Sequence, residues 1–300
     1  METDVLYEEL RPLLFSIAYR MTGTVSDAED LVQEAFIRYG RAERDDVESP
    51  KAYLSAVVTR LAIDHLRSAR VRREQYVGEW LPEPLVADTA PDAAETADEL
   101  SLAFLVVLET LSPTERAVFL LREVFGYPYD EIARVVGRTE VNARQIATRA
   151  RRHVDERRPR FDVSRAERDE LADRFFAAAV DGDTDALVEL LAADVVVHGD
   201  GGGKAPQIAG PVAGAQRVAK LLAGWFRIAG DLDARIDRVV VNGQPGVVIR
   251  TAAGEIGSVM SLDVADGQVQ TIRSIVNPEK LQHLGPVADV RAVLREHRAR

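Results

Sequence analysis

Residues 129–152 read YDEIARVVGRTEVNARQIATRARR, and this stretch decides the fold of the central part of the chain. Small and apolar residues recur in it at the spacing of a helix-turn-helix: Ile132, Ala133, Val136, Gly137 and Ile146. The small side chain of Ala133 lets two helices cross closely, and Gly137, four residues later, supplies a turn in which a positive φ is often needed. Thr139 has the side chain of a helix N-cap. The stretch therefore predicts two helices joined by a tight turn.

The second helix of this motif would carry polar side chains on its outer surface. Those that could meet base edges or phosphates are Arg138, Thr139, Glu140, Asn142, Arg144 and Arg149. The alternative is an ordinary helical hairpin whose basic face is only solvated.

The distribution of charge bears on this choice. The formal net charge of −11 argues at first against a nucleic acid partner. However, residues 60–73 hold five Arg and one acid, residues 77–100 hold seven acids and no base, and residues 140–158 hold six Arg and three acids. Binding of a polyanion depends on local basic patches and not on total charge. The pattern therefore favours DNA.

Composition excludes several classes of protein. An apolar fraction of 46% with 29% charged residues is typical of a soluble globular protein, and no apolar run approaches the roughly 20 residues that span a bilayer. The absence of cysteine excludes disulfides and thiolate metal sites, and the acidic N-terminus is not signal-like. We expect a cytoplasmic protein without membrane insertion.

Helical segments precede the motif. Residues 5–40 have the apolar spacing of two amphipathic helices, with a capping box at Ser26–Glu29 starting the second. Ser49-Pro50 signals the start of a long helix that becomes Arg-rich toward its C-terminal end. Another capping box, Ser112–Glu115, starts a helix just before the motif. Two helical units are therefore expected, the second over residues 100–160.

The composition changes twice after residue 76. Residues 77–99 contain three prolines among acids and alanines, which is typical of a linker, but the apolar piece Trp80–Leu85 within it predicts a segment that docks on a surface. In residues 161–285 helical patterns are followed by short β-rich runs, separated by the hairpin signals Asn242-Gly243 and Asp266-Gly267. The predicted fold class is multidomain, with two all-α domains followed by an α+β domain.

The order and spacing of the helical segments resemble the extracytoplasmic-function sigma factors, the minimal two-domain promoter-recognition subunits of bacterial RNA polymerase. The stretch DAEDLVQEAFIR (Asp27–Arg38) carries much of this resemblance. It is similar to the segment that docks on a coiled coil of the polymerase β′ subunit, which implies that Asp30, Gln33 and Glu34 face the core enzyme. A solvated acidic helix face is the alternative. The β and β′ subunits and promoter DNA are the implied partners.

The long helix AYLSAVVTRLAIDHLRSARVRRE (Ala52–Glu74) is similar to the element of this family that reads the −10 promoter region. The resemblance implies that its surface captures an unstacked base of the non-template strand. The candidate side chains are Arg60, Asp64, Arg67 and Arg70, although Arg67 and Arg70 could equally hold phosphates without base preference. The helix-turn-helix would then read the −35 element. Ala143 departs from the larger aliphatic residue that the family commonly has, which affects packing or specificity there.

The last third resembles the SnoaL-like group of the nuclear transport factor 2 superfamily. A subset of these sigma factors carries such a fused domain, and three short motifs of that subset are present: WLPEP (Trp80–Pro84), DGGGK (Asp200–Lys204) and NPEKL (Asn277–Leu281). The implied division is sigma region 2 over 1–76, a linker over 77–99, sigma region 4 over 100–160, a SnoaL-like domain over 161–285 and a tail over 286–300.

We expect the DGGGK loop and the Asn277 segment to make an intramolecular contact with the linker or with the promoter-binding domains, and this contact to regulate promoter binding. The residues assigned to it are Trp80, Leu81, Pro82, Glu83, Pro84, Asp200, Gly201, Gly202, Gly203, Lys204, Asn277 and Pro278. Three glycines allow close backbone approach, and their N–H groups could bind an anion or a carbonyl. The two prolines make WLPEP a segment that loses little entropy on docking. A flexible glycine turn without a partner is the alternative.

Two other functions compete with the sigma factor hypothesis. SnoaL-like cyclases and isomerases use an Asp/His pair in the cone of the fold, and His198 and Asp200 are the candidates for such a pair here. A one-component regulator that senses a small ligand is the other, but it leaves DAEDLVQEAF unexplained. No zinc spacing, P-loop or nucleophile motif is present. We therefore expect a non-enzymatic sigma factor without cofactor or metal, and leave open an unidentified ligand or regulator of the C-terminal domain.

Overall fold

The computed structural model describes residues 2–42, 49–74, 76–87, 100–157 and 164–299, with side chains except at 2–4 and 69–74. The chain forms two compact units. The first joins Met1–Gln75 with Phe104–Arg158, and the second joins Tyr76–Ala103 with Pro159–Arg300. The predicted class, helical domains followed by an α+β domain, is confirmed.

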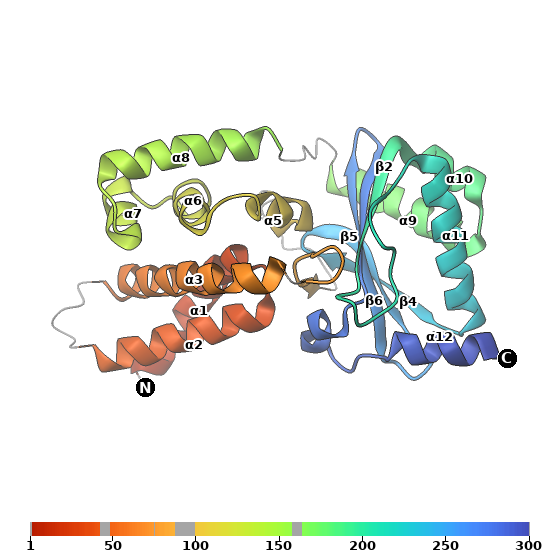
Figure 1. The fold of residues 1–300 in the computed structure, drawn as a ribbon, viewed down its shortest axis with the longest axis horizontal. Coiled ribbons are helices and arrows are strands. Elements are labelled where there is room, and N and C mark those ends of the chain that lie inside the picture. Colours follow the sequence, from red (N-terminus) through yellow and green to blue (C-terminus); the bar gives the residue numbers. More distant parts are fainter. Residues whose placement is uncertain (1, 43–48, 75, 88–99, 158–163, 300) are drawn as a thin grey trace. The chain divides into compact units, whose positions relative to one another are not determined.

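The first unit begins with three packed helices, α1 (Glu2–Thr22), α2 (Val25–Arg41) and α3 (Pro50–Glu74) (Figure 1). Their buried faces supply the core side chains Leu14, Ile17, Leu31, Val32, Leu54 and Val58. The Ser49-Pro50 start signal is confirmed, since Ser49 Oγ accepts from the Ala52 N–H. The expected capping box at Ser26–Glu29 is wrong. Helix α2 starts at Val25, two residues earlier than a Ser26 cap implies, with Thr24 as N-cap.

The rest of this unit consists of α5 (Leu102–Leu108), α6 (Pro113–Phe119), a π-helical turn (Leu120–Val124), α7 (Tyr129–Val136) and α8 (Glu140–Asp155). Both bonds of the capping box between Ser112 and Glu115 are formed. Gly137 ends α7 with a φ of 64°, and Thr139 Oγ1 accepts from the Asn142 N–H at 3.2 Å. The turn and the cap of the helix-turn-helix are therefore confirmed.

The second unit is built on a seven-stranded sheet in the order β1-β4-β5-β6-β7-β2-β3. The strands are β1 (Val86–Ala87), β2 (Leu191–Asp200), β3 (Val212–Ala213), β4 (Arg235–Val241), β5 (Gln244–Arg250), β6 (Ile256–Ala265) and β7 (Gln268–Ile275). All pairs are antiparallel except β2 with β7, so the sheet is mixed. Asn242 and Asp266 have φ of 51° before glycines with positive φ, as hairpin turns of the predicted kind require.

The two faces of this sheet have different roles. The inner face packs against α9 (Arg165–Asp181), α10 (Thr184–Leu190) and α11 (Ala215–Asp231) (Figure 1), with core residues such as Val197, Met260, Leu262 and Ile272. Because side chains alternate along a strand, polar residues between these positions belong to the outer face. They are His198, Asp200, Ser261, Asp263 and Arg273.

The segment expected to be a linker differs from that expectation where it is described. Val86 and Ala87 pair with Val241 and Val240 as edge strand β1, and Leu81 is 2% exposed. Residues 76–87 are therefore part of the second unit; residues 88–99 lie outside the described residues.

The expected C-terminal tail likewise carries structure. Helix α12 (Val290–Ala299) follows a bridge between Val287 and Ile256. None of the helices in the described ranges is long and apolar enough to cross a membrane.

The positive φ of Gly137 gives a prediction about stability. Gly137→Ala should lower the free energy of unfolding by about 1–2 kcal/mol, because an L side chain is strained in this region. A β-carbon there would meet no described atom within 4 Å, so the cost comes from the backbone. Gly137→Asn should cost less. Urea unfolding followed by circular dichroism measures these changes.

The control is the same substitution inside a helix. Gly224 in α11 has an ordinary φ and free space around it, so Gly224→Ala should stabilise the protein by about 0.5–1 kcal/mol. Equal effects of the two substitutions would contradict this account of Gly137.

Candidate nucleic-acid interface and linker seat

Helix α8 presents a polar outer face opposite a buried one. Its buried positions are Ala143, Ile146, Ala147, Ala150 and Val154. The predicted DNA-facing side chains are all exposed: Arg138, Thr139, Glu140, Asn142, Arg144 and Arg149. Arg144 Nη2 pairs with Glu140 Oε1 at 2.5 Å, and its guanidinium lies 4.6 Å from the ring centroid of Tyr129. The first turn of α8 thus offers donors and acceptors from a fixed surface.

Two residues of α8 add to what the sequence indicated. Ala143 is fully buried in the cluster that joins α6, α7 and α8, so its departure from the family pattern is one of packing. Val141 is 66% exposed beside Asn142, which was not expected of an apolar residue. An exposed aliphatic group at this place suits contact with a thymine methyl.

The four candidates on α3 are not presented together. Asp64 and Arg67 are exposed and form an ion pair at 3.1 Å. Arg60 instead donates from Nε to the Val135 carbonyl at 3.0 Å and from Nη2 to the Arg134 carbonyl at 2.9 Å, so it holds the C-terminal end of α7. The side chain of Arg70 lies outside the described residues.

On α2, the residues that are predicted to face core polymerase form one stripe. Asp30 and Gln33 are exposed, and the half-buried Glu34 accepts from Arg38 Nε at 2.7 Å. Ile37 continues the same stripe one turn later and is 48% exposed. The sequence alone did not single out Ile37, because an apolar residue in an amphipathic helix is expected to be buried.

The buried carboxylate of Asp200 is the centre of a site that we call the linker seat: Tyr76, Leu81, Asp200, Asn277 and Lys280. Asp200 is fully buried at the end of β2. Its Oδ1 accepts from the Tyr76 hydroxyl at 2.5 Å, and its Oδ2 accepts from the Leu81 N–H at 2.8 Å and from Lys280 Nζ at 2.6 Å. One aspartate therefore binds the WLPEP segment and the NPEKL segment at once.

Lys280 makes further contacts with the residues of the linker segment. Its Nζ also donates to the Leu81 carbonyl, and it lies 4.2 Å from the ring centroid of Trp80 and 4.9 Å from that of Tyr76. Burial and the bond to Asp200 raise the pKa of Tyr76, so its phenol stays protonated and donates. Asn277 Nδ2 donates to the same phenol oxygen at 2.7 Å. Both polar groups of the Leu81 peptide are thus satisfied by buried charges.

The glycines of DGGGK are required by the closeness of these neighbours. Gly202 has a φ of 58°, and a β-carbon there would overlap the Asn277 side chain and approach Tyr76 Oη to 3.0 Å. A β-carbon at Gly203 would lie 3.0 Å from Val77. The Lys204 N–H donates to the Gly201 carbonyl within the loop, and Lys204 Nζ pairs with Glu279. Because Gly202 and Gly203 have no side chains, Tyr76 and Val77 can lie against the loop.

The remainder of WLPEP is buried along the same path. Pro82, Glu83 and Pro84 are buried, and the Pro84 carbonyl lies 2.8 Å from His283 Nε2. The Leu85 N–H donates to Asn242 Oδ1 at 2.9 Å, just before strand β1. Pro278 starts a 3-10 turn (Pro278–Lys280) capped by Asn277. Tyr76, Asn242 and His283 are not predicted for this contact, because nothing in their local sequence marks a contact with a distant segment. Lys280 lies within the NPEKL motif, of which the sequence analysis assigns only Asn277 and Pro278 to the contact.

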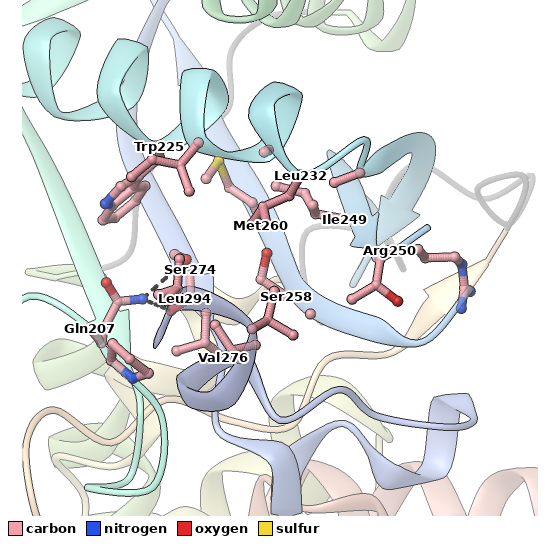
Figure 2. Close-up of a pocket in the computed structure, with 18 of the residues that line it drawn as sticks. Gln207, Trp225, Leu232, Ile249, Arg250, Ser258, Met260, Ser274, Val276 and Leu294 are labelled. Atoms are coloured by element: carbon pink, nitrogen blue, oxygen red, sulfur yellow. Dashed lines mark hydrogen bonds between the residues drawn. The ribbon is translucent and has the colours of Figure 1, made fainter. Parts of the chain in front are cut away.

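The Asp/His pair expected of an enzyme is not in the cavity of this domain. His198 Nδ1 lies 2.6 Å from Glu79 Oε1, and Asp200 accepts a hydrogen bond from the Leu81 N–H of the linker. Both side chains therefore make their contacts on the outer face of the sheet. A cavity of about 420 Å³ lies on the inner face, lined by residues such as Trp225, Ser258 and Met260 (Figure 2). Neither His198 nor Asp200 lines it.

Comparison with known proteins agrees with this architecture. Residues 6–72 match the family described as Sigma-70 region 2, residues 101–154 match Sigma-70, region 4, and residues 172–276 match the SnoaL-like domain. The chain is 40% identical over 287 residues to ECF RNA polymerase sigma factor SigJ of Mycobacterium tuberculosis, covering 91% of each chain. It is 37% identical over 282 residues to the probable ECF RNA polymerase sigma factor SigI of the same organism, covering 91% of this chain and 93% of that one.

The crystal structure of Mycobacterium tuberculosis extracytoplasmic function sigma factor SigJ has a TM-score of 0.74 with this structure, at 35% identity, and covers 93% of this chain and 98% of that one. With two sigma regions, a fused SnoaL-like domain and similarity along nearly its whole length, the chain belongs to the ECF RNA polymerase sigma factors and is not an enzyme.

Proposed function

We propose that the SnoaL-like domain modulates this sigma factor in cis, by binding the segment that joins its two promoter-reading regions. The observation that carries the proposal is the linker seat. Leu81 is almost fully buried, and both polar groups of its peptide are bonded to residues of the SnoaL-like domain. A segment held in this way is a structural part of the domain and not a free tether.

The docked segment lies between the two sigma regions in the chain, and its docking therefore affects both of them. Residues 76–103 belong to the SnoaL-like unit, while the chain on either side, up to Gln75 and from Phe104, belongs to the helical unit. A free linker lets two DNA-reading regions separate to any distance its length allows. A seated linker restricts that separation. The domain therefore limits how the −10 and −35 regions reach a promoter.

The sigma regions act through the surfaces described above. The stripe Asp30, Gln33, Glu34 and Ile37 on α2 binds core polymerase, with an aliphatic side chain among polar ones as protein interfaces require. The outer face of α8 reads the −35 element in the major groove, and Asp64 and Arg67 on α3 contact the −10 strand. Arg60 also contacts the −10 strand after its hydrogen bonds to the carbonyl groups of α7 have broken.

Readout by α8 is tested with promoters selected by the wild-type holoenzyme from a randomised library. Asn142→Ala should lose about 1–3 kcal/mol of discrimination at one or two base pairs, because an amide can bond two atoms of an adenine edge. Arg149→Ala should weaken binding to all promoters and reduce the salt dependence by about one phosphate contact. Electrophoretic mobility shifts at several salt concentrations measure both.

The matched control is Arg227→Ala, which removes an exposed arginine of α11 in the SnoaL-like domain. It should change neither specificity nor salt dependence. If Asn142→Ala and Arg149→Ala lost affinity in the same uniform way, α8 would hold the backbone without reading bases.

Modulation in cis is tested by removing the side chain that anchors the linker. Leu81→Ala should destabilise the docked segment by about 2–5 kcal/mol, as truncation of a buried leucine does. We expect run-off transcription with core polymerase to rise about threefold or more, since the released linker no longer restricts the two regions. Lys280→Met, which leaves Asp200 without its cation, should act in the same direction.

Leu222→Ala is the control for general destabilisation. Leu222 is fully buried in α11 and belongs to the core of the same domain, away from the linker. Its truncation should lower the melting temperature without the increase in transcription. Transcription unchanged in Leu81→Ala and Lys280→Met would refute modulation through the seat, and a decrease in both would show that the seated linker is the active arrangement.

A further inference from the structure

The cavity on the inner face of the sheet is separate from the linker seat. Its volume of about 420 Å³ lies within the range of sites that enclose small ligands. The wall comes from α11, strands β5 to β7, a loop before β3 and helix α12. Figure 2 shows Trp225 and Leu232 above it, with Ser258 and Leu294 across from them. Helix α12 contributes Val290, Val293 and Leu294, so the C-terminal segment forms one side of the cavity.

The lining has a definite chemistry. Most of the surface is apolar, including Trp225, Ile249 and Met260. The Ser258 hydroxyl has no hydrogen-bond partner among the described residues, and Ser258 lines the cavity (Figure 2). Among the described lining residues, Arg250 and Arg298 carry charge and none is an acid.

The two arginines are not equivalent. Arg250 Nε donates to Asp237 at 3.1 Å, and its Nη1 donates to the Gly254 carbonyl at 3.3 Å, so its guanidinium is held by the protein; Asp237 also pairs with Arg235 at 2.9 Å. Arg298 is exposed on the last turns of α12 and forms no ion pair with a described residue. Among the described lining residues of this apolar cavity, Arg298 is therefore the charged side chain that lacks an ion-pair partner.

We infer that this cavity binds a small, mainly apolar molecule that bears one anionic oxygen group, such as a carboxylate. The apolar body fills the space between Trp225 and Leu294, and a polar atom of the ligand bonds Ser258. The anionic end lies at the rim near Arg298. The regulatory consequence of this binding rests on the function proposed above, whereas the binding itself does not.

The cavity and the linker seat share backbone. Ser274 and Val276 line the cavity, whereas Asn277 belongs to the seat. Ser274 is the register partner of Gly199, the residue before Asp200, and the Val276 and Asn277 N–H groups both donate to the Asp200 carbonyl, at 2.9 and 3.1 Å. A ligand that displaces this stretch of β7 therefore displaces the seat.

Gln207 strengthens this connection. Its Nε2 donates to Ser274 Oγ at 3.2 Å (Figure 2), and its side chain covers Gly199 so closely that a β-carbon there would lie 2.5 Å from Gln207 Cδ. A ligand that contacts Gln207 presses on the strand that ends in Asp200. Binding in the cavity and docking of the linker are thus expected to be linked.

Binding is tested on the full-length protein with two probes, the fluorescent apolar anion 8-anilino-1-naphthalenesulfonate and decanoate as its competitor. The wild type should bind the dye, and decanoate should displace it. Ser258→Phe, which fills the cavity, should abolish binding. Arg298→Glu should weaken both probes about fivefold, as reversal of one exposed charge does, whereas Arg295→Glu, exposed on the same helix but outside the lining, should not.

Dye binding that persists equally in Ser258→Phe and Arg298→Glu, with cooperative unfolding retained, would overturn the site. Because Arg298 is exposed, its substitution keeps the test valid even if Ser258→Phe fails to fold. Equal loss in Arg298→Glu and Arg295→Glu would also overturn it, since general surface charge would then explain the binding.

The link to the seat is tested by fluorescence. The chain has two tryptophans, Trp80 beside Lys280 and Trp225 in the cavity wall. In Trp225→Phe, emission reports on Trp80 alone, and saturating decanoate should move it toward the spectrum of the same variant carrying Lys280→Met. Binding without any change in Trp80 emission would overturn the link. If decanoate binds but Leu81→Ala leaves transcription unchanged, modulation through the seat fails while the ligand site stands.

Discussion

The arrangement of the second unit depends on one buried ion pair, between Asp200 and Lys280. A carboxylate that is fully buried costs several kcal/mol to desolvate, and it is tolerated only with good partners on most of its acceptor sites. Asp200 has three: the Tyr76 hydroxyl, the Leu81 N–H and the Lys280 ammonium. Two of these come from the linker. Removing the linker would therefore leave a buried ion pair partly solvated and partly unsatisfied, and this cost favours the docked segment.

The same pair explains the composition of the three motifs. DGGGK supplies the aspartate and the glycines that let Asn277 and Val77 approach, NPEKL supplies the lysine, and WLPEP supplies a peptide whose N–H and C=O groups are both used. Two prolines around Glu83 reduce the entropy that this segment loses on docking. The three motifs meet in one contact although 115 residues separate WLPEP from DGGGK and 72 separate DGGGK from NPEKL.

The sequence predicted most of the features that are encoded locally, with the capping box at Ser26–Glu29 as an exception. The Gly137 turn, the Thr139 cap, the capping box at Ser112 and the two hairpin turns are each set by residues a few positions apart, and the structure has them as expected. The partners of the seat depend instead on long-range packing. Lys280 looks like any surface lysine until the fold brings it to Asp200, and Ile37 looks like a core residue. The sequence offers His198 as part of a catalytic pair, but alternation along β2 places it on the outer face, next to Glu79.

The hydrogen bonds of Arg60 within the helical unit bear on promoter binding. Its guanidinium holds the last carbonyl groups of α7, a favourable position for a cation at a helix C-terminus. The same guanidinium cannot hold a promoter phosphate or base at that time. Two partly exposed hydrogen bonds from a charged donor contribute on the order of 1–3 kcal/mol, a cost that contacts with DNA and core polymerase readily offset. In the function proposed above, contacts with DNA and core polymerase replace these two hydrogen bonds, and a constraint on the chain between the two regions acts at this step.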